Sequence, residues 1–250
     1  MKKKIEAPLL LLHGFPLDSS MWDGQVGYFK GKYPVLSPDL PGFGKSAIRA
    51  PETIEGFAEE VKSFLDENNV AKIVLIGFSM GGYIALAFYE MFPNYLEAIV
   101  LADTRAAADS PEGRAGRNVM INSLKEKGME EIAKTMAPKL LSERGMKNGR
   151  LLKSVREMMV RQRPDSVKNA LIAMRERKER SALLEKIDIP ALFICGEEDL
   201  LTPPSEMKMM AERVKNGSFA LIKGAGHLSN MEEAVSFNET LSLFLEKIER

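Results

Sequence analysis

The sequence predicts an α/β fold, with a mostly parallel β-sheet flanked by helices and a block of helices inserted into it. Two observations predict this class. Short apolar runs bounded by Gly or Pro alternate with helical patterns over the first hundred residues and again near the end, which is typical of buried parallel strands joined by crossover helices. Between about residues 104 and 185 the strand signal disappears, and every periodic segment is helical.

The individual elements follow from these patterns in chain order. Phe57, Val61 and Leu65 recur at helical spacing before the third apolar run, and residues 84–88 populate a helix after it. Further helices are expected near residues 205–214 and 232–248. The expected strands lie at residues 9–12, 34–37, 72–76, 98–101, 189–195 and 218–222.

The helical block divides the chain into two predicted domains, a core of residues 1–103 and 186–250 and a cap of residues 104–185. We expect about four helices in the cap, because apolar side chains share one face within each periodic segment. Seven of the fifteen methionines lie there, either as ordinary core packing or as an adaptable apolar roof over a substrate pocket. On the second interpretation the substrate contacts are Phe15, Met120, Met136 and Met158.

Charge and cysteine content exclude several classes of protein. Basic and acidic residues balance at 35 each, so no uniform field attracts nucleic acid or an anionic membrane. Residues 103–186 nevertheless hold 20 basic and 12 acidic side chains, a surplus that either attracts anionic substrates or belongs to solvated helix faces. Cys195 is the single cysteine, so no intramolecular disulfide forms, and the apolar run around it predicts a buried strand position.

Neither a signal peptide nor a membrane span is expected. The apolar run after the N-terminal lysines covers only residues 9–12, against the roughly 7 to 15 residues that a signal peptide needs. The longest uncharged stretch, residues 73–89, is interrupted by glycines and is just short of a span. We therefore expect a cytoplasmic protein, and monomer and homodimer both remain open.

A serine at a strand-to-helix turn is the candidate nucleophile. Residues 77–81 read Gly-Phe-Ser-Met-Gly, directly after an apolar run and before a helical pattern. In such a turn the serine hydroxyl is held out above the sheet, and the glycines are needed because side chains would collide with neighbouring backbone. This context favours Ser79 as a catalytic nucleophile over a merely tight turn.

A serine hydroxyl needs an adjacent base, and the chain has two histidines. His13 directly follows the first strand, in a position that shapes the loop beside Ser79. His227 follows the last strand and so emerges at the same carboxyl edge of the sheet as Ser79. Elimination and position favour His227 as the general base over a structural or surface histidine.

The imidazole in turn requires a carboxylate that fixes its tautomer and stabilises its positive charge. Asp199 and Asp103 both follow predicted strands, at the edge where α/β sheets place their chemistry. Only Asp199 satisfies the chain order serine, aspartate, histidine. Asp199 is therefore the expected acid, and Asp103 is kept as a structural or fallback acid.

The negative oxygen of a tetrahedral intermediate must meet preorganised donors. Met80 offers its backbone N–H, because it directly follows Ser79 at the start of a helix. The second expected donor is the backbone N–H of Phe15, since Pro16 has none.

Taken together, these motifs resemble the α/β-hydrolase fold superfamily. The similarity extends over almost the whole chain, in the family's order, and within the superfamily it is greatest to small bacterial carboxylesterases and 3-oxoadipate enol-lactonase-like serine hydrolases. The segment before the first strand is too short for the antiparallel hairpin that is common at the family's N-terminus, so we expect a shortened sheet of about six or seven strands. The segments that carry the resemblance are residues 13–16, 39–46, 77–82, 196–199 and 224–227.

The sequence thus predicts hydrolysis of a small-molecule carboxylic ester through an acyl-enzyme, without cofactor or metal. A lactonase of the enol-lactone type and an esterase for carrier-linked methyl esters are alternatives within the same chemistry. Acyl transfer or perhydrolysis would use the same nucleophile with another acceptor. A small-molecule receptor on a hydrolase fold is the alternative from a different class.

Overall fold

The computed structural model describes residues 6–249 and contains one six-stranded sheet. The strand order is β2-β1-β3-β4-β5-β6, and every described strand pair is parallel. The predicted α/β class and the shortened N-terminal part of the sheet are therefore confirmed. The strands are β1 (Leu9–Leu12), β2 (Val35–Leu36), β3 (Ile73–Phe78), β4 (Leu96–Ala102), β5 (Ala191–Gly196) and β6 (Gly217–Ile222).

The inner strands of this sheet are buried on both faces. Every residue of β1, β3 and β5 is buried, whereas β2 and β6 at the two edges are partly exposed. This difference explains why the inner strands are continuous apolar runs. Leu12 at the end of β1 is opposite Gly77, which is opposite Leu101 of β4, so the carboxyl ends of the strands share one edge.

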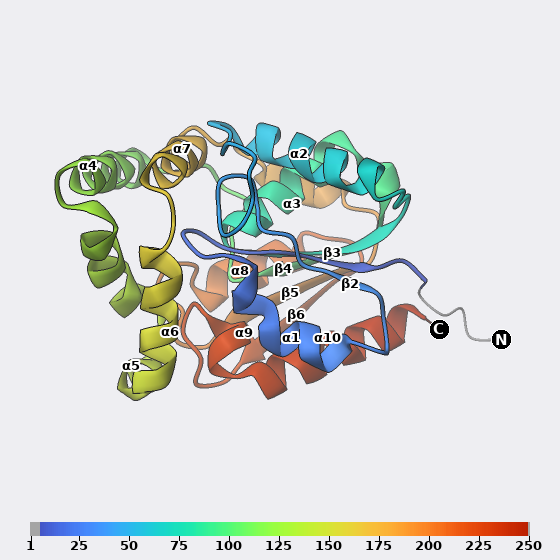
Figure 1. Cartoon of the computed structure of the whole chain (residues 1–250). Coiled ribbons are helices and arrows are strands. Elements are labelled where there is room, and N and C mark those ends of the chain that lie inside the picture. Colours follow the sequence, from blue (N-terminus) through green and yellow to red (C-terminus); the bar gives the residue numbers. More distant parts are fainter. Residues whose placement is uncertain (1–5, 250) are drawn as a thin grey trace.

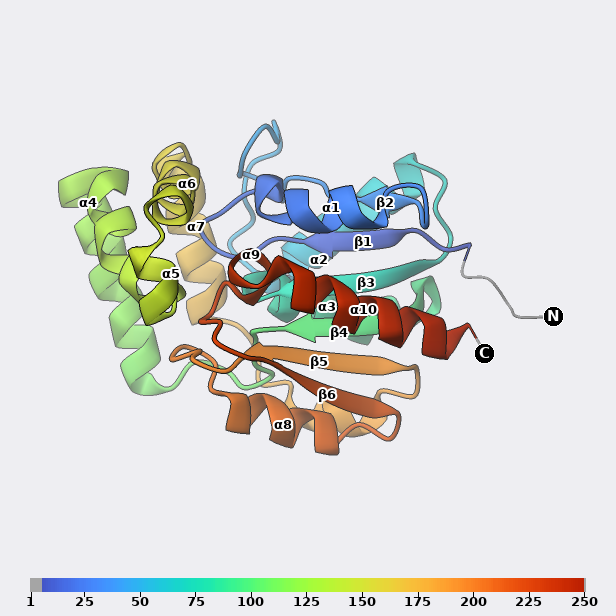
Figure 2. The same ribbon diagram turned by 90° about the horizontal axis from the view of Figure 1, so that it is seen from below.

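Helices cover both faces of the sheet (Figures 1 and 2). Helices α2 (Ile54–Glu67) and α3 (Met80–Met91) lie on one face, and α1 (Asp23–Phe29) and α10 (Ala234–Ile248) lie on the other. Helix α8 (Pro204–Glu212) packs beside β5 and β6. The short helix α9 (Ser229–Glu232) and the 3-10 helices Ser19–Trp22, Pro93–Tyr95 and Ser181–Lys186 complete this part of the chain.

Between β4 and β5 the described residues form helices and no strand. Figure 2 shows these helices beyond the carboxyl ends of the strands. We call residues 104–185 the helical segment, and its status as a separate domain stays a prediction. Its first helix bends at Gly128, where φ is 73° and ψ is −169°. The four helices are α4 (Pro111–Leu140), α5 (Glu143–Lys147), α6 (Gly149–Val160) and α7 (Pro164–Arg175).

A buried acid attaches the helical segment to the loop after β1. The carboxylate of Asp18 accepts two hydrogen bonds of 2.6 Å from the Arg161 guanidinium and one of 2.8 Å from the Gln162 amide. The Gln162 side chain also accepts a hydrogen bond of 2.9 Å from the Gly44 amide. These contacts fix the end of α6 against two loops at the edge of the sheet.

Two further expectations concern membranes and cysteine chemistry. Among residues 6–249, no helix combines the length and the apolar character needed to cross a membrane. Cys195 is fully buried in β5, as expected, and burial raises the pKa of its thiol far above the ordinary value. The thiol therefore acts as a small core residue rather than as a reactive group.

Candidate active site

Ser79 lies in a strained turn between β3 and α3. Its backbone has φ 52° and ψ −112°, outside the usual regions for a residue with a side chain. A Cβ atom on Gly77 would overlap the carbonyl of Gly81, and one on Gly81 would overlap the carbonyl of Leu12. The two glycines thus permit the close packing of β1, β3 and α3 that holds the serine in this conformation.

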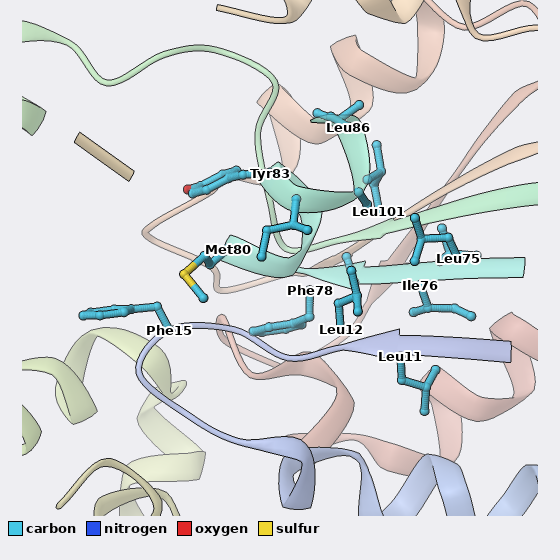
Figure 3. Packing of buried hydrophobic residues seen from close by; sticks show 14 of the residues in the cluster. Leu11, Leu12, Phe15, Leu75, Ile76, Phe78, Met80, Tyr83, Leu86 and Leu101 are labelled. Carbon is cyan, nitrogen blue, oxygen red and sulfur yellow. The ribbon is translucent and has the colours of Figure 1, made fainter. Parts of the chain in front are cut away.

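The turn also sets the direction in which nearby side chains point. In Figure 3, Phe15, Met80 and Tyr83 extend from the loop after β1 and from α3 toward the region beyond the carboxyl ends of the strands. The leucine and isoleucine side chains behind them fill the interior. Ser79 directly precedes Met80 in the chain and therefore lies where the packed core meets the region that Phe15, Met80 and Tyr83 enter.

The structure brings Ser79, His227 and Asp199 together from three separate loops. Ser79 Oγ lies 2.9 Å from His227 Nε2, and His227 Nδ1 lies 2.8 Å from Asp199 Oδ2. An ionised carboxylate can only accept, so Nδ1 carries the proton and Nε2 is left to accept from the serine hydroxyl. This is the tautomer in which the imidazole can take up the serine proton.

The Asp199 carboxylate is held by several donors besides the imidazole. Its Oδ1 accepts hydrogen bonds from the amides of Leu201 at 2.8 Å and Thr202 at 3.0 Å, and its Oδ2 accepts one from the Thr202 hydroxyl. Burial alone would raise the pKa of Asp199, but the neighbouring His227 and these hydrogen bonds lower it below the ordinary value. Asp199 is therefore ionised beside the imidazole. Sequence reasoning missed Thr202, because no local pattern indicates which hydroxyl contacts the Asp199 carboxylate.

His13 has a different role from His227. The amide of Leu40 donates to its Nε2 at 2.9 Å, and its Nδ1 donates to the carbonyl of Gly14 at 2.9 Å. Complete burial lowers the pKa of His13, so the ring is neutral. It connects the loop after β1 to the loop before Gly42, in agreement with the expectation that it shapes this region.

The two predicted oxyanion donors lie beside the serine. The amides of Phe15 and Met80 donate no hydrogen bond to any backbone acceptor among residues 6–249. Met80 is the first residue of α3, where the helix dipole favours an anion. Both amides are thus available to a ligand, and their role as an oxyanion hole stays a prediction.

A cavity of about 360 Å³ opens onto Ser79 and His227. The described residues around it include Phe15, Met120 and Met136, three of the four expected substrate contacts, but not Met158. Met158 is buried in α6, which packs against α4. The wall also contains Met174, one of the seven methionines that form the expected roof, and three apolar side chains that sequence reasoning did not identify, Tyr83, Leu140 and Leu201.

The cavity wall also carries three cationic side chains and one carboxylate. Arg117 pairs with Asp109 at 3.1 Å, and Arg105 pairs with Glu206 outside the wall at 3.3 Å. Lys139 has no ion-pair partner among residues 6–249. Asp109 is further neutralised by Arg177 at 2.5 Å, outside the wall. The wall therefore has an excess of positive charge.

One group of side chains has the spacing of a metal site. One ligand atom each from Asp103, Asp199 and His227 lies within 4.8 Å of the other two. Asp103 accepts from the Gly196 amide at 2.8 Å and from the Ser229 hydroxyl, and the other two side chains hydrogen-bond to each other. These internal hydrogen bonds account for the close spacing of the three side chains.

Comparison with known proteins assigns the family. Residues 7–234 match the family model of the alpha/beta hydrolase fold. A thermophilic esterase from Thermogutta terrifontis, solved with malate bound, is 34% identical with a TM-score of 0.94, covering 100% of this chain and 93% of the other. The enol-lactonase from Burkholderia xenovorans is 26% identical with a TM-score of 0.88, covering 96% and 91%.

Relatives of assigned activity give the same result. A pimeloyl-[acyl-carrier protein] methyl ester esterase from Neisseria meningitidis is 27% identical over 95% of this chain and 93% of its own length. 3-Oxoadipate enol-lactonase 1 from Acinetobacter baylyi is 27% identical over 93% and 86%. The chain belongs to the α/β hydrolase fold family, and the predicted resemblance to its esterases and lactonases is confirmed.

Proposed function

We propose that this protein is a serine-dependent carboxylic ester hydrolase with Ser79, His227 and Asp199 as its catalytic triad. One observation carries the proposal: the unbroken chain of contacts of 2.9 Å and 2.8 Å that joins the serine oxygen to the imidazole and the imidazole to the carboxylate. The strained turn at Ser79 and the cavity above it support the same assignment, as do the relatives named as esterases and enol-lactonases.

In the acylation step, Ser79 Oγ attacks the ester carbonyl carbon while its proton passes to His227 Nε2. Asp199 stabilises the resulting imidazolium. The amides of Phe15 and Met80 donate to the carbonyl oxygen as it becomes negative, and each such donor typically lowers the barrier by about 3 kcal/mol. The imidazolium then protonates the leaving alcohol, and an acyl-enzyme remains.

Deacylation repeats these steps with water. His227 Nε2 removes a proton from the water, the hydroxide oxygen attacks the acyl carbon, and the imidazolium returns the proton to Ser79 Oγ. The products are a carboxylic acid and the free enzyme. A lactone follows the same path, except that its alcohol and acid remain parts of one molecule.

The test uses p-nitrophenyl esters of increasing acyl length together with simple lactones. Ser79→Ala should lower kcat/KM by at least about 1,000-fold, because the nucleophile is lost. Ser63→Ala is the matched control, since the Ser63 hydroxyl donates to the Glu59 carbonyl on the exposed side of α2. Equal turnover by wild type and Ser79→Ala would reject the proposal, and the relative rates on esters and lactones separate esterase from lactonase.

The charges of the cavity refine the substrate class. Arg105, Arg117 and Lys139 outnumber Asp109 on its wall, and Lys139 carries no ion pair within the described chain. A cation without a partner beside an apolar cavity favours a substrate that bears its own carboxylate. We therefore include in the proposal an ester or lactone with an anionic group. Malate in the related esterase structure is consistent with this chemistry.

Two esters with acyl chains of equal length test the refinement. Mono-p-nitrophenyl succinate carries a free carboxylate, and p-nitrophenyl butyrate does not. Lys139→Gln should raise KM for the succinate about 3- to 10-fold and leave the butyrate unchanged. Lys134→Gln, on the same helix but outside the cavity, is the matched control. A similar change for both esters would show that Lys139 does not recognise the anion.

Alternatives within the family depend on the acyl or alcohol group. The names of the relatives suggest an enol-lactone or a carrier-linked methyl ester as substrates, and both chemistries use the same triad. Added alcohol or peroxide would divert the acyl-enzyme if the protein were an acyltransferase or a perhydrolase. Slow turnover with tight product retention would indicate a receptor. A cytoplasmic location, as monomer or homodimer, belongs to the same proposal.

A further inference from the structure

Asp103 is a buried acid that the proposed mechanism does not use. It directly follows β4, has no exposed surface, and has a positive φ of 45°. Its own amide donates to the Ile194 carbonyl at 2.9 Å. A charged residue in this position is costly unless it is held by specific partners.

Both partners of its carboxylate lie within three residues of a triad residue in the sequence. Gly196, whose amide donates to Asp103 Oδ1 at 2.8 Å, begins the turn that leads to Asp199. Ser229, whose hydroxyl donates to Oδ2, follows His227 by two residues. Asp103 is therefore positioned by the same two loops that position the acid and the base.

The spacing puts Asp103 within electrostatic range of both. One ligand atom each from Asp103, Asp199 and His227 lies within 4.8 Å of the other two. The negative charge of one buried carboxylate disfavours ionisation of a neighbouring one. Burial, followed by the charge of Asp199, raises the pKa of Asp103 well above its ordinary value, whereas His227 keeps that of Asp199 low. Asp103 thus carries the proton and Asp199 carries the charge.

We propose that Asp103 is a reserve acid: a second carboxylate that releases its proton to solvent and balances the imidazolium of His227 when Asp199 is removed. The inference rests on the proposed function, because it assumes that His227 becomes positively charged during turnover. In the intact protein Asp103 is neutral and only positions the two loops. Without Asp199, its negative charge no longer opposes ionisation of Asp103, and the positive imidazolium of His227 then favours the charged form of this buried carboxyl.

A double-mutant cycle tests the reserve acid. Asp103→Asn replaces a protonated carboxyl by an amide of similar shape, so alone it should change kcat/KM less than about 3-fold. Asp199→Ala should keep about 1% or more of wild-type kcat/KM. The double variant should lose at least a further 10-fold, far more than Asp103→Asn costs alone. In Asp199→Ala the remaining activity should rise with pH as Asp103 ionises, and this dependence should be missing from the double variant.

The controls separate this role from a structural one. A residue that only supports the fold would lower activity by the same factor in both backgrounds and would leave the pH profile of Asp199→Ala unchanged. Asp66→Asn, an exposed acid on α2 that pairs with Lys62, should have no effect in either background. An Asp199→Ala variant no more active than Ser79→Ala, or a double variant as active as Asp199→Ala, overturns the inference. A wild type without Ser79-dependent activity would instead reject the proposed function.

Discussion

The sheet and the helical segment differ in how closely their side chains are packed. Every residue of β1, β3 and β5 is buried, and the turn at Ser79 leaves no room for a side chain at Gly77 or Gly81. In α4, by contrast, Leu124 is the single buried residue before the bend at Gly128. The sheet and the turn at Ser79 tolerate almost no change in atomic positions, whereas the first half of α4 has exposed surface and charged faces.

This difference in packing corresponds to the separate roles that we propose for the two regions, catalysis for the sheet edge and substrate contact for the helical segment. The candidate triad comes from turns at the carboxyl edge of the sheet, where close packing fixes atoms to the accuracy that proton transfer requires. The methionines of the cavity wall, Met120, Met136 and Met174, come from α4 and α7. Methionine side chains are flexible and can adapt to different acyl groups. Substitutions in the two regions should therefore affect different parameters.

The largest effect on catalysis is expected for the general base, His227, at the edge of the closely packed sheet. His227→Ala should lower kcat by about 10,000-fold or more, because neither the serine proton nor the leaving alcohol would have a proton carrier. Near-ultraviolet circular dichroism should show that the fold is retained. A loss smaller than about 10-fold would mean that another group acts as the base.

A pair of glycine substitutions compares the packing of the two regions directly. Gly77→Ala should lower the free energy of unfolding by about 3 kcal/mol, because a Cβ atom there overlaps backbone atoms of Gly81. Gly116→Ala in α4 has nothing within 4 Å of the new Cβ and should stabilise by about 0.5 to 1 kcal/mol through helix propensity. Urea unfolding of both variants measures the difference, and equal effects would contradict the comparison.

The contacts of Asp18, which connect the sheet to the helical segment, should weaken at low pH. Burial would raise the pKa of Asp18, but the hydrogen bonds from Arg161 and Ser20 and the charge of Arg161 lower it from 3.8 to about 2. Because the pKa in the folded state is depressed, this contribution to stability is complete above about pH 4 to 5 and is lost as pH falls toward 2. Asp18→Asn should therefore lower the free energy of unfolding at neutral pH by only about 1 to 2 kcal/mol, because the half-exposed Arg161 weakens the ion pair. Near pH 2 the same substitution should have a much smaller effect.

Hydrogen exchange of the α6 amides, followed as a function of pH, checks this prediction. Protection in wild type should fall as the medium is acidified through this range, and Asp18→Asn should be less protected already at pH 7. Arg49→Gln, which removes an exposed ion pair with Glu52, is the control and should leave α6 unchanged. A variant that is as well protected as wild type at pH 7 would show that other contacts hold the segment.

The smallest effect is expected in the adaptable wall. Met120 lines the cavity and is partly exposed, so Met120→Ala should change the free energy of unfolding by less than about 1 kcal/mol. It should raise KM for long-chain p-nitrophenyl esters about 3-fold relative to acetate, because apolar contact is lost only with the longer chain. A uniform change in kcat for all esters would instead connect Met120 to the chemical step.

The amino-acid sequence alone was sufficient to predict the strands, the turn at Ser79 and the positions of His227 and Asp199 at strand ends. These features are local: apolar runs predict buried strands, glycines mark a close approach, and parallel strands necessarily end at a common edge. The boundaries were less accurate, since β2 has two residues, Val35 and Leu36, where residues 34–37 were expected. Edge strands end where pairing ends, and pairing depends on the neighbouring strand.

Only the tertiary structure decided which side chains meet in the cavity. Met120 and Met136 reach it and Met158 does not, although all three lie in helical patterns of the same segment. Arg105, Lys139 and Thr202 could not be identified beforehand for the same reason. Which face of a helix is turned toward a cavity depends on how that helix packs against others, and the bend at Gly128 turns the two halves of α4 independently. The spatial relation of Asp103 to the triad likewise arises only when β4, β5 and the loop after β6 are assembled.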